Sequence, residues 1–234
     1  MEQLKKVYDA FTANLIPKDL FELINSRFSL VLEGIARIEK ASGIGFPISY
    51  VEPSAVLSSA TNSFEYGILF ARTIPIFSKN SVEIIIQISA PLVAYGLKGT
   101  IHAILAHEFL HYLELISRLS KMNIISDEVS GNLFENVYSD YTRLFEPQSV
   151  FDDKTLLQHI TKRFPSGFRD YKLEDKAVNF WIEKNLPTSK ITLDTNIVKL
   201  NAESLSKLKI NSVLLKKLEQ IQTKNLKIRK KRIY

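Results

Sequence analysis

Apolar residues in the first fifth of the chain recur at helical spacing. Residues 2–13 are predicted to form a helix, and Pro17 is well placed as the first residue of a longer helix that runs to about Ser42. Gly43 and Gly45 follow directly and predict the end of that helix. One face of the longer helix is predicted to be buried, and it carries Leu20, Phe21, Ile24, Phe28, Val31, Leu32, Ile35 and Ile38.

Between residues 47 and 89 the pattern changes to short β-branched or aromatic segments that are separated by turn residues. Such segments are typical of strands. The sequence Ser78-Lys79-Asn80-Ser81 predicts the turn of a hairpin that joins the last two of them. The predicted strands are residues 47–51, 66–72, 75–77 and 82–89.

Helical spacing returns in the second half of the chain. One helix is predicted from Thr100, as its N-cap, to about Met122, and a second one from Ser126 to about residue 145, before Pro147. The remainder is predicted to be mostly helical, with loops at residues 165–167 and 187–190.

These elements predict an α+β fold in two parts. A core formed by residues 1–146 would contain a small mixed sheet, over about residues 46–89, packed on the helix of about residues 100–122. Residues 147–234 would form a helical C-terminal subdomain.

Composition restricts the chemistry that the chain can perform. Its 234 residues are 45% hydrophobic and 24% charged, which is typical of a globular protein. The absence of cysteine excludes disulfides, thiolate nucleophiles and Cys-rich zinc sites, so a metal ion would be bound by His, Asp or Glu. A cysteine-free chain without a secretion signal or an apolar run of roughly 20 residues predicts a cytoplasmic protein with no transmembrane helix.

The segment His107-Glu108-Phe109-Leu110-His111 is the strongest candidate for a functional site. Residues i and i+4 lie one above the other on a helix, so both imidazoles can reach one ion at roughly 2.0–2.1 Å. Glu108 points about 100° around the helix, where it can take a proton from metal-bound water. His102 falls about 140° away from His107 and is interpreted as a packed or surface histidine.

Such a short motif also occurs by chance, and three features of its context favour a functional reading. It lies in the middle of the predicted helix, uncharged residues flank it from Ile104 to Leu113, and a helix rich in carboxylates follows. The stretch Ile104-Leu105-Ala106-His107-Glu108-Phe109-Leu110-His111-Tyr112-Leu113 resembles the extended signature of the zincin superfamily of zinc metallopeptidases.

The third metal ligand distinguishes the branches of that superfamily. The metzincin branch has a glycine and a histidine where this chain has Glu114 and Ser117, so the resemblance is to the gluzincin branch. It implies a zincin-like fold, one Zn²⁺ per chain and hydrolysis of peptide bonds, with Glu108 as the general base that accepts a proton from zinc-activated water.

In gluzincins the third ligand is a glutamate on the following helix, for which Glu128, Glu135 and Asp140 are the candidates. If the two helices form an antiparallel hairpin, Glu135 lies at about the level of His111, and we choose it. The stretch around Glu135 is similar to the Asn-Glu-x-x-Ser-Asp glutamate helix of gluzincins, with Phe134 in place of the asparagine and Asp140 one residue late.

Hydrolysis also requires a donor to the developing oxyanion. Tyr138 is our choice, with Tyr141 and His159 as alternatives, although a tyrosine on such a helix is more often a core residue. The resemblance further implies that residues 82–89 form the edge strand that binds an extended substrate peptide, the alternative being a plain core strand.

Positive charge is concentrated at the C-terminus, since residues 213–234 contain eight Lys or Arg and one Glu. This tail could contact nucleic acid or an anionic surface weakly, or it could be a solvated and frayed terminus. Two other functions therefore stay open. One is a non-catalytic zinc-binding regulatory protein of the same fold, and the other is a helical nucleic-acid-binding module in which the histidine motif is accidental.

Overall fold

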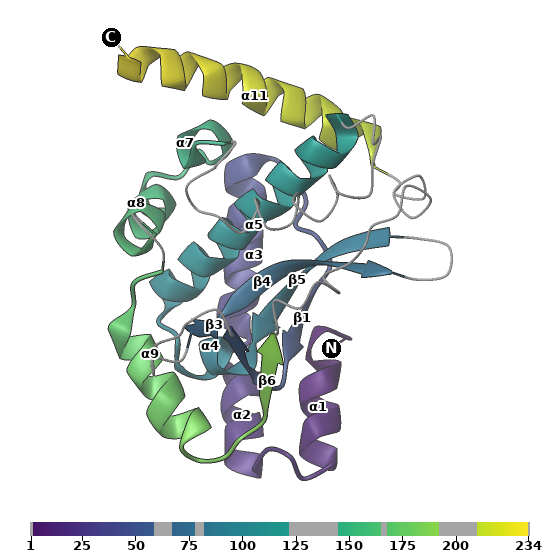
Figure 1. The fold of residues 1–234 in the computed structure, drawn as a ribbon, viewed down its shortest axis with the longest axis vertical. Helices are drawn as coiled ribbons and strands as arrows, with labels where there is room; N and C mark the ends of the chain where they lie inside the picture. Colours follow the sequence, from purple (N-terminus) through teal and green to yellow (C-terminus); the bar gives the residue numbers. More distant parts are fainter. Residues whose placement is uncertain are drawn as a thin grey trace.

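The structure, a computed structural model, is a mixed α+β fold built around one long helix, α5 (Lys98–Lys121). This helix packs against α3 (Ser29–Ser42) and α8 (Lys154–Arg163), and against strands β4 (Ala71–Phe77) and β5 (Val82–Ser89) (Figure 1). The structure describes residues 2–58, 67–77, 82–121, 145–164, 168–191 and 210–233.

The N-terminal helices agree with the sequence except at one break. A 3₁₀ turn, η1 (Glu2–Leu4), leads into α1 (Lys5–Thr12), as predicted. The single helix predicted to begin at Pro17 is instead two helices, α2 (Lys18–Arg27) and α3, which are separated at Phe28. Gly43 ends α3 with a left-handed φ of 66°, a conformation that costs glycine little.

The first sheet has the strand order β1-β5-β4, where β1 is Ser49–Glu52. β1 runs parallel to β5, and β4 runs antiparallel to it with Phe77 opposite Val82. The predicted hairpin is therefore confirmed, although its turn residues lie outside the described part of the chain. β5 is flanked on both sides, so the expectation that residues 82–89 form an edge strand is wrong, and β4 lies at the edge instead.

A second sheet, with the order β3-β2-β6, was only partly predicted. β2 (Ala55–Ser58) pairs antiparallel with β3 (Gly67–Leu69) and parallel with β6 (Thr188–Ile191). The loop predicted at residues 187–190 is thus wrong, because most of it is strand. Short strands with polar residues acquire their conformation from the partner strand, which here is distant in sequence.

The apolar stretch of residues 82–95 is a strand followed by a short helix, α4 (Ala90–Tyr95), with Pro91 in its first turn. α5 then begins at Lys98, two residues before the predicted cap. Thr100 lies inside the helix, where its hydroxyl donates to Asp170 Oδ2 at 2.6 Å. None of the described helices combines the length and apolar character that a membrane span requires.

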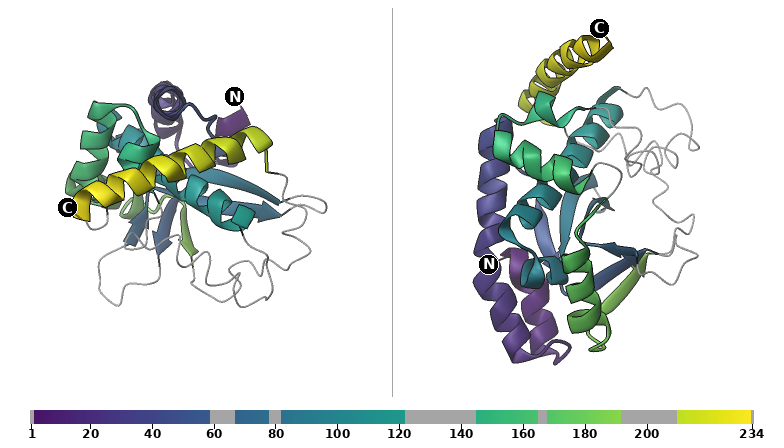
Figure 2. Two further views of the ribbon diagram at one scale, coloured as in Figure 1. Left: turned by 90° about the horizontal axis from the view of Figure 1, so that it is seen from above. Right: turned by 90° about the vertical axis from the view of Figure 1, so that its left-hand side faces the viewer.

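The C-terminal region wraps around α5. α8 lies along α5, and the last helix crosses the end of the molecule, as Figure 2 shows from two further directions. The basic tail is therefore helical over most of its length, with Leu218, Ile221 and Asn225 buried. The elements of this region other than α8 and β6 are α7 (Pro147–Val150), α9 (Tyr171–Ala177), the π-helical turn η3 (Val178–Ile182) and α11 (Ser212–Ile233).

The core joins both halves of the chain. Leu156 and Leu218 belong to the same buried apolar cluster as Leu105 and Ile86. The single tryptophan, Trp181, is fully buried and donates from Nε1 to the carbonyl oxygen of Pro187 at 2.8 Å. The proposed boundary at residue 146 stays a prediction, because residues on either side of it share this cluster.

Candidate metal centre

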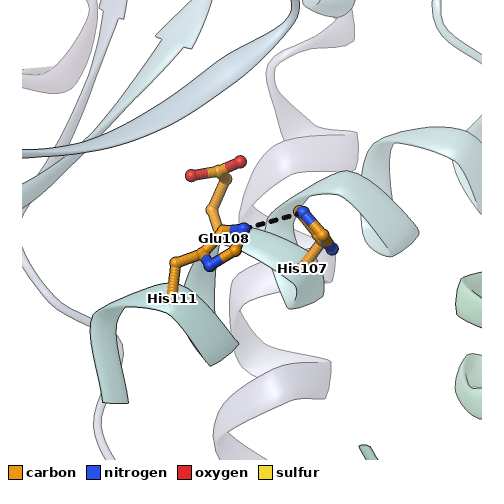
Figure 3. A group of neighbouring side chains, drawn as sticks. All are labelled: His107, Glu108 and His111. Atoms are coloured by element: carbon orange, nitrogen blue, oxygen red, sulfur yellow. Dashed lines mark hydrogen bonds between the residues drawn. The ribbon is translucent and has the colours of Figure 1, made fainter. Parts of the chain in front are cut away.

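α5 places His107 and His111 one turn apart on the same face. Both side chains are buried, at 7% and 4% exposure. Their rings are nearly perpendicular, with centroids 4.4 Å apart and an interplanar angle of 87°. The two Nε2 atoms face each other at 2.9 Å (Figure 3). The helix therefore brings together two imidazole nitrogens in a buried position.

This pair fits the dimensions of a metal site. Two histidines that bind one ion tetrahedrally at roughly 2.0–2.1 Å have nitrogens about 3.4 Å apart. The observed 2.9 Å needs only a small rotation of the rings to reach that separation. Donor atoms of His107, Glu108 and His111 all lie within 4.8 Å of one another. This buried group could bind a metal ion.

Glu108 is also buried, and its carboxylate points from α5 toward β4. Thr73 on β4 contacts it twice, with Oγ1 3.0 Å from Glu108 Oε2 and 2.9 Å from the backbone carbonyl oxygen of Glu108. One hydroxyl proton serves one of these acceptors at a time. The carboxylate is consequently held beside the histidine pair.

The ring of Phe164 covers His107. The two rings are stacked, with centroids 4.0 Å apart and an interplanar angle of 6°. Phe164 directly follows α8 and is 8% exposed. This contact shields one face of the imidazole from water and restricts its rotation.

Two polar clusters fix the two ends of α8. Arg37 of α3 forms a two-pronged ion pair with Asp153, at 2.6 and 2.8 Å, and Asp153 also caps α8 by accepting from the Leu156 N–H. The Arg37 guanidinium lowers the pKa of Asp153 to about 2. At the other end of the helix, Arg163 Nε donates to Thr100 Oγ1 at 2.9 Å. The start of α8 is thus bound to α3, and its end is bound to α5.

Glu114 lies behind His111, on the side opposite to His107. Its Oε2 is 3.8 Å from His111 Nδ1, and its Oε1 accepts a hydrogen bond from the Phe145 N–H at 3.2 Å. Because Nε2 of His111 faces His107, Glu114 is close to the nitrogen that does not face the candidate metal position. The Glu114 carboxylate is thus a neighbour of the His111 ring, at a distance longer than a hydrogen bond.

A pocket of about 190 Å³ opens beside the histidine pair. His107, Glu108 and His111 form its polar part, and most of the other lining residues are apolar. They come from the end of β3, the beginning of β4, α5 and the segment after α8, and are Ile68, Leu69, Phe70, Ala71, Arg72, Ile104, Phe164 and Phe168.

Several predicted site residues are not brought to this pocket or cannot be placed. Glu135, Tyr138 and the alternatives Glu128, Asp140 and Tyr141 lie outside the described residues. His159 packs against Gly99, eight residues or about 12 Å along α5 from His107, and it does not line the pocket.

His102 is a packed histidine, one of the two readings that its sequence position left open. It is 2% exposed, donates from Nε2 to the Leu30 carbonyl oxygen at 3.1 Å, and lies against Gly34, where a Cβ would be 2.8 Å from its ring. Burial lowers its pKa, which favours the neutral ring.

Sequence reasoning missed Glu114, Thr73 and Phe164. Glu114 could have been found, because it is three residues after His111 and so lies on the same helix face. Thr73 and Phe164 carry no comparable signal, since only the tertiary fold brings them to α5.

The chain was also compared with known proteins. No protein-family profile, curated protein or solved structure matches it. The functional conclusion therefore depends on the geometry of His107, Glu108 and His111.

Proposed function

We propose that this chain is a zinc-dependent peptidase of the zincin type. The observation that carries the proposal is the buried pair of facing imidazoles, His107 and His111, with the Glu108 carboxylate beside them on the wall of a pocket. In this proposal the two histidines bind Zn²⁺, and Glu108 is the general base.

The donor set favours zinc over the other common divalent ions. Two neutral imidazoles suit zinc, copper, nickel and iron, whereas magnesium and calcium prefer oxygen ligands only. Zinc also tolerates the four-coordinate geometry that a helical histidine pair offers, and it leaves a position for a reacting molecule. The predicted third ligand is Glu135, with Glu128 and Asp140 as alternatives.

Each residue has a distinct role in the proposed hydrolysis. Bound zinc would lower the pKa of a coordinated water to about 7 and polarise the peptide carbonyl. Glu108 accepts the proton of the attacking water, and the Thr73 hydroxyl orients that carboxylate through its 3.0 Å contact. Phe164 restricts the His107 ring by stacking on it, and the Glu114 carboxylate lies 3.8 Å from Nδ1 of His111, where it would favour the orientation that binds zinc. Tyr138 stays the predicted oxyanion donor.

A peptide substrate would lie along β4. This strand ends the first sheet, and no described strand pairs with its outer side. β4 also contributes Ala71 to the pocket and Thr73 to the contact with Glu108. An extended peptide that added to this edge by main-chain hydrogen bonds would pass directly beside the histidine pair.

Metal binding is the first test. We expect the purified protein to bind one Zn²⁺ per chain, measured by elemental analysis and calorimetry, and His107→Ala to lose it. His159→Ala is the matched control, because His159 lies against Gly99 and away from the pocket. A protein that neither contains nor binds zinc would show that the proposal is wrong.

The role of Glu108 is the second part of the test. Glu108→Gln should keep zinc and lower the rate of peptide hydrolysis by about 10²–10⁴-fold, since a general base contributes roughly that factor. Zinc binding with equal, negligible hydrolysis in both proteins would instead support the non-catalytic alternative. Loss of zinc in Glu108→Gln would identify Glu108 as a ligand.

A further inference from the structure

The pocket beside His107 has a wall of aromatic rings. Phe164 stacks on His107, Phe168 is tilted against Phe164 with centroids 5.5 Å apart, and Phe70 follows at 5.3 Å from Phe168. The three phenylalanines therefore form a continuous apolar surface that begins at the candidate metal ligand. Phe70 is 4% exposed, so part of this surface belongs to the core of the protein.

Another part of the pocket lining is a small side chain, Ala71. Side chains alternate along a strand, so Ala71 shares the face of β4 that carries Thr73, and that face is turned toward α5. Because Ala71 is small, the space in front of it is left to the pocket. Ile104, one turn before His107 on α5, lines the pocket as well.

The charged side chain of Arg72 points away from the aromatic part of the pocket. Arg72 lines the pocket, but its side chain is on the other face of β4, where Nε donates to Oε1 of Gln87, its pairing partner on β5. The remaining charged residue of the lining is Glu108, next to the histidines. A positively or negatively charged group that entered the aromatic part would find no described counterion there, and its burial would be unfavourable.

The size of the pocket matches one apolar side chain. A dry apolar cavity of about 150 Å³ binds benzene, so a pocket of about 190 Å³ can admit a phenyl or branched aliphatic group. We propose that this pocket binds an aromatic or large aliphatic side chain of the substrate, next to the bond that is cleaved. The proposal depends on the proposed peptidase function, and it names the class of peptide that the site accepts.

Binding of small metal-chelating probes tests the pocket without turnover. Acetohydroxamate, phenylacetohydroxamate and the same phenyl compound with a para-ammoniomethyl group would be titrated calorimetrically into the zinc-loaded protein. Burial of the phenyl group should make phenylacetohydroxamate bind about 10- to 100-fold more tightly than acetohydroxamate. The para-ammoniomethyl compound should lose most of this gain in affinity.

Two variants test whether the gain in affinity from the phenyl group arises in the pocket. Phe168→Ala removes a wall residue that does not stack on His107, and it should reduce the gain of the phenyl compound several-fold while leaving acetohydroxamate binding unchanged. Phe180→Ala is the matched control, since Phe180 is 52% exposed, contacts Tyr95 and does not line the pocket. If Phe168→Ala does not fold, Ala71→Leu, which fills the pocket from β4, should have the same effect.

The outcomes separate this inference from the function on which it depends. Equal affinities for acetohydroxamate and phenylacetohydroxamate in a protein that binds zinc would overturn the pocket assignment and leave the peptidase proposal intact. Failure to bind zinc would overturn both. If Phe168→Ala and Ala71→Leu both leave the affinity gain of phenylacetohydroxamate unchanged, the phenyl group binds elsewhere. That result also contradicts the assignment.

Discussion

His111 has a neighbouring side chain at each of its ring nitrogens. Nε2 faces His107 at 2.9 Å, and Nδ1 is 3.8 Å from the Glu114 carboxylate. A carboxylate behind a metal-binding imidazole fixes the ring and makes it a better ligand. The other carboxylate oxygen of Glu114, Oε1, accepts a hydrogen bond from the Phe145 N–H.

We therefore expect Glu114→Gln to weaken zinc binding by about 10–100-fold, a factor typical of such orienting groups. The glutamine can keep the hydrogen bond from Phe145, so the fold should persist. The measurement is a zinc titration in competition with a chelator. Glu22→Gln, at an exposed position on α2, is the matched control. An affinity equal to that of the wild type would mean that Glu114 has only a structural role.

At the scale of residues, the sequence predicts the relative positions of side chains that belong to one helix. His107, Glu108 and His111 could be assigned together because their spacing alone places them on adjoining faces of one helix. Thr73, 35 residues before Glu108, and Phe164, directly after α8, reach the site only through packing. Contacts of this kind leave no periodic trace in the sequence. Glu135 and Tyr138 stay predictions.

Among the elements, α8 is the one that positions the ring stacked on His107. It carries Phe164 at its end, and Asp153 at its start forms the ion pair with Arg37. The pKa of Asp153 falls from its usual 3.8 to about 2, because Arg37 favours the carboxylate. This contribution to stability is complete above pH 4 and is lost as the pH falls through about 2.

Asp153→Asn should consequently lower the free energy of unfolding by about 1–2 kcal/mol at pH 7, a range discounted for the partial exposure of the pair. The difference from wild type should shrink between pH 4 and 2 and vanish below that, as measured by urea unfolding. Asn also caps helices well, so the loss reports the ion pair. Asp153→Ala removes the cap too and should cost about 1 kcal/mol more. A difference that stays constant with pH would contradict this assignment.

The elements that sequence reasoning found are those with local signals. The hairpin of β4 and β5 and the end of α3 at Gly43 depend on turn residues that lie within the segment itself. β6 was missed because its register with β2 is set across more than 130 residues, by pairing and not by its own composition. The break at Phe28 falls within an uninterrupted apolar periodicity and so has no counterpart in the pattern.

At the scale of the whole molecule, α11 links the C-terminal region to α5. Gln222 donates to Ser117 Oγ of α5 at 2.7 Å, and Asn225 accepts the Glu146 N–H at 2.8 Å. Leu218 is the most buried apolar side chain among those described in this helix, at 2% exposure. The lysines of this helix remain exposed, and their contact with an anionic partner stays a prediction.

Leu218→Ala should lower the free energy of unfolding by about 2–4 kcal/mol, through lost burial and the cavity that remains. Leu226→Ala provides the comparison on the same helix, since Leu226 is 61% exposed and its truncation should change stability by less than about 0.5 kcal/mol. Equal effects of the two substitutions, measured by denaturant unfolding, would show that α11 does not pack as described.

Because Trp181 is buried, its fluorescence reports whether the protein is folded. The chain has one indole, it is fully enclosed between Tyr95 and the Pro187 carbonyl, and it lies outside the pocket beside His107. Fluorescence excited at this chromophore therefore comes from one known environment, which becomes aqueous when the chain unfolds. Its emission wavelength measures the folded fraction of any variant, with zinc present or absent, without a label.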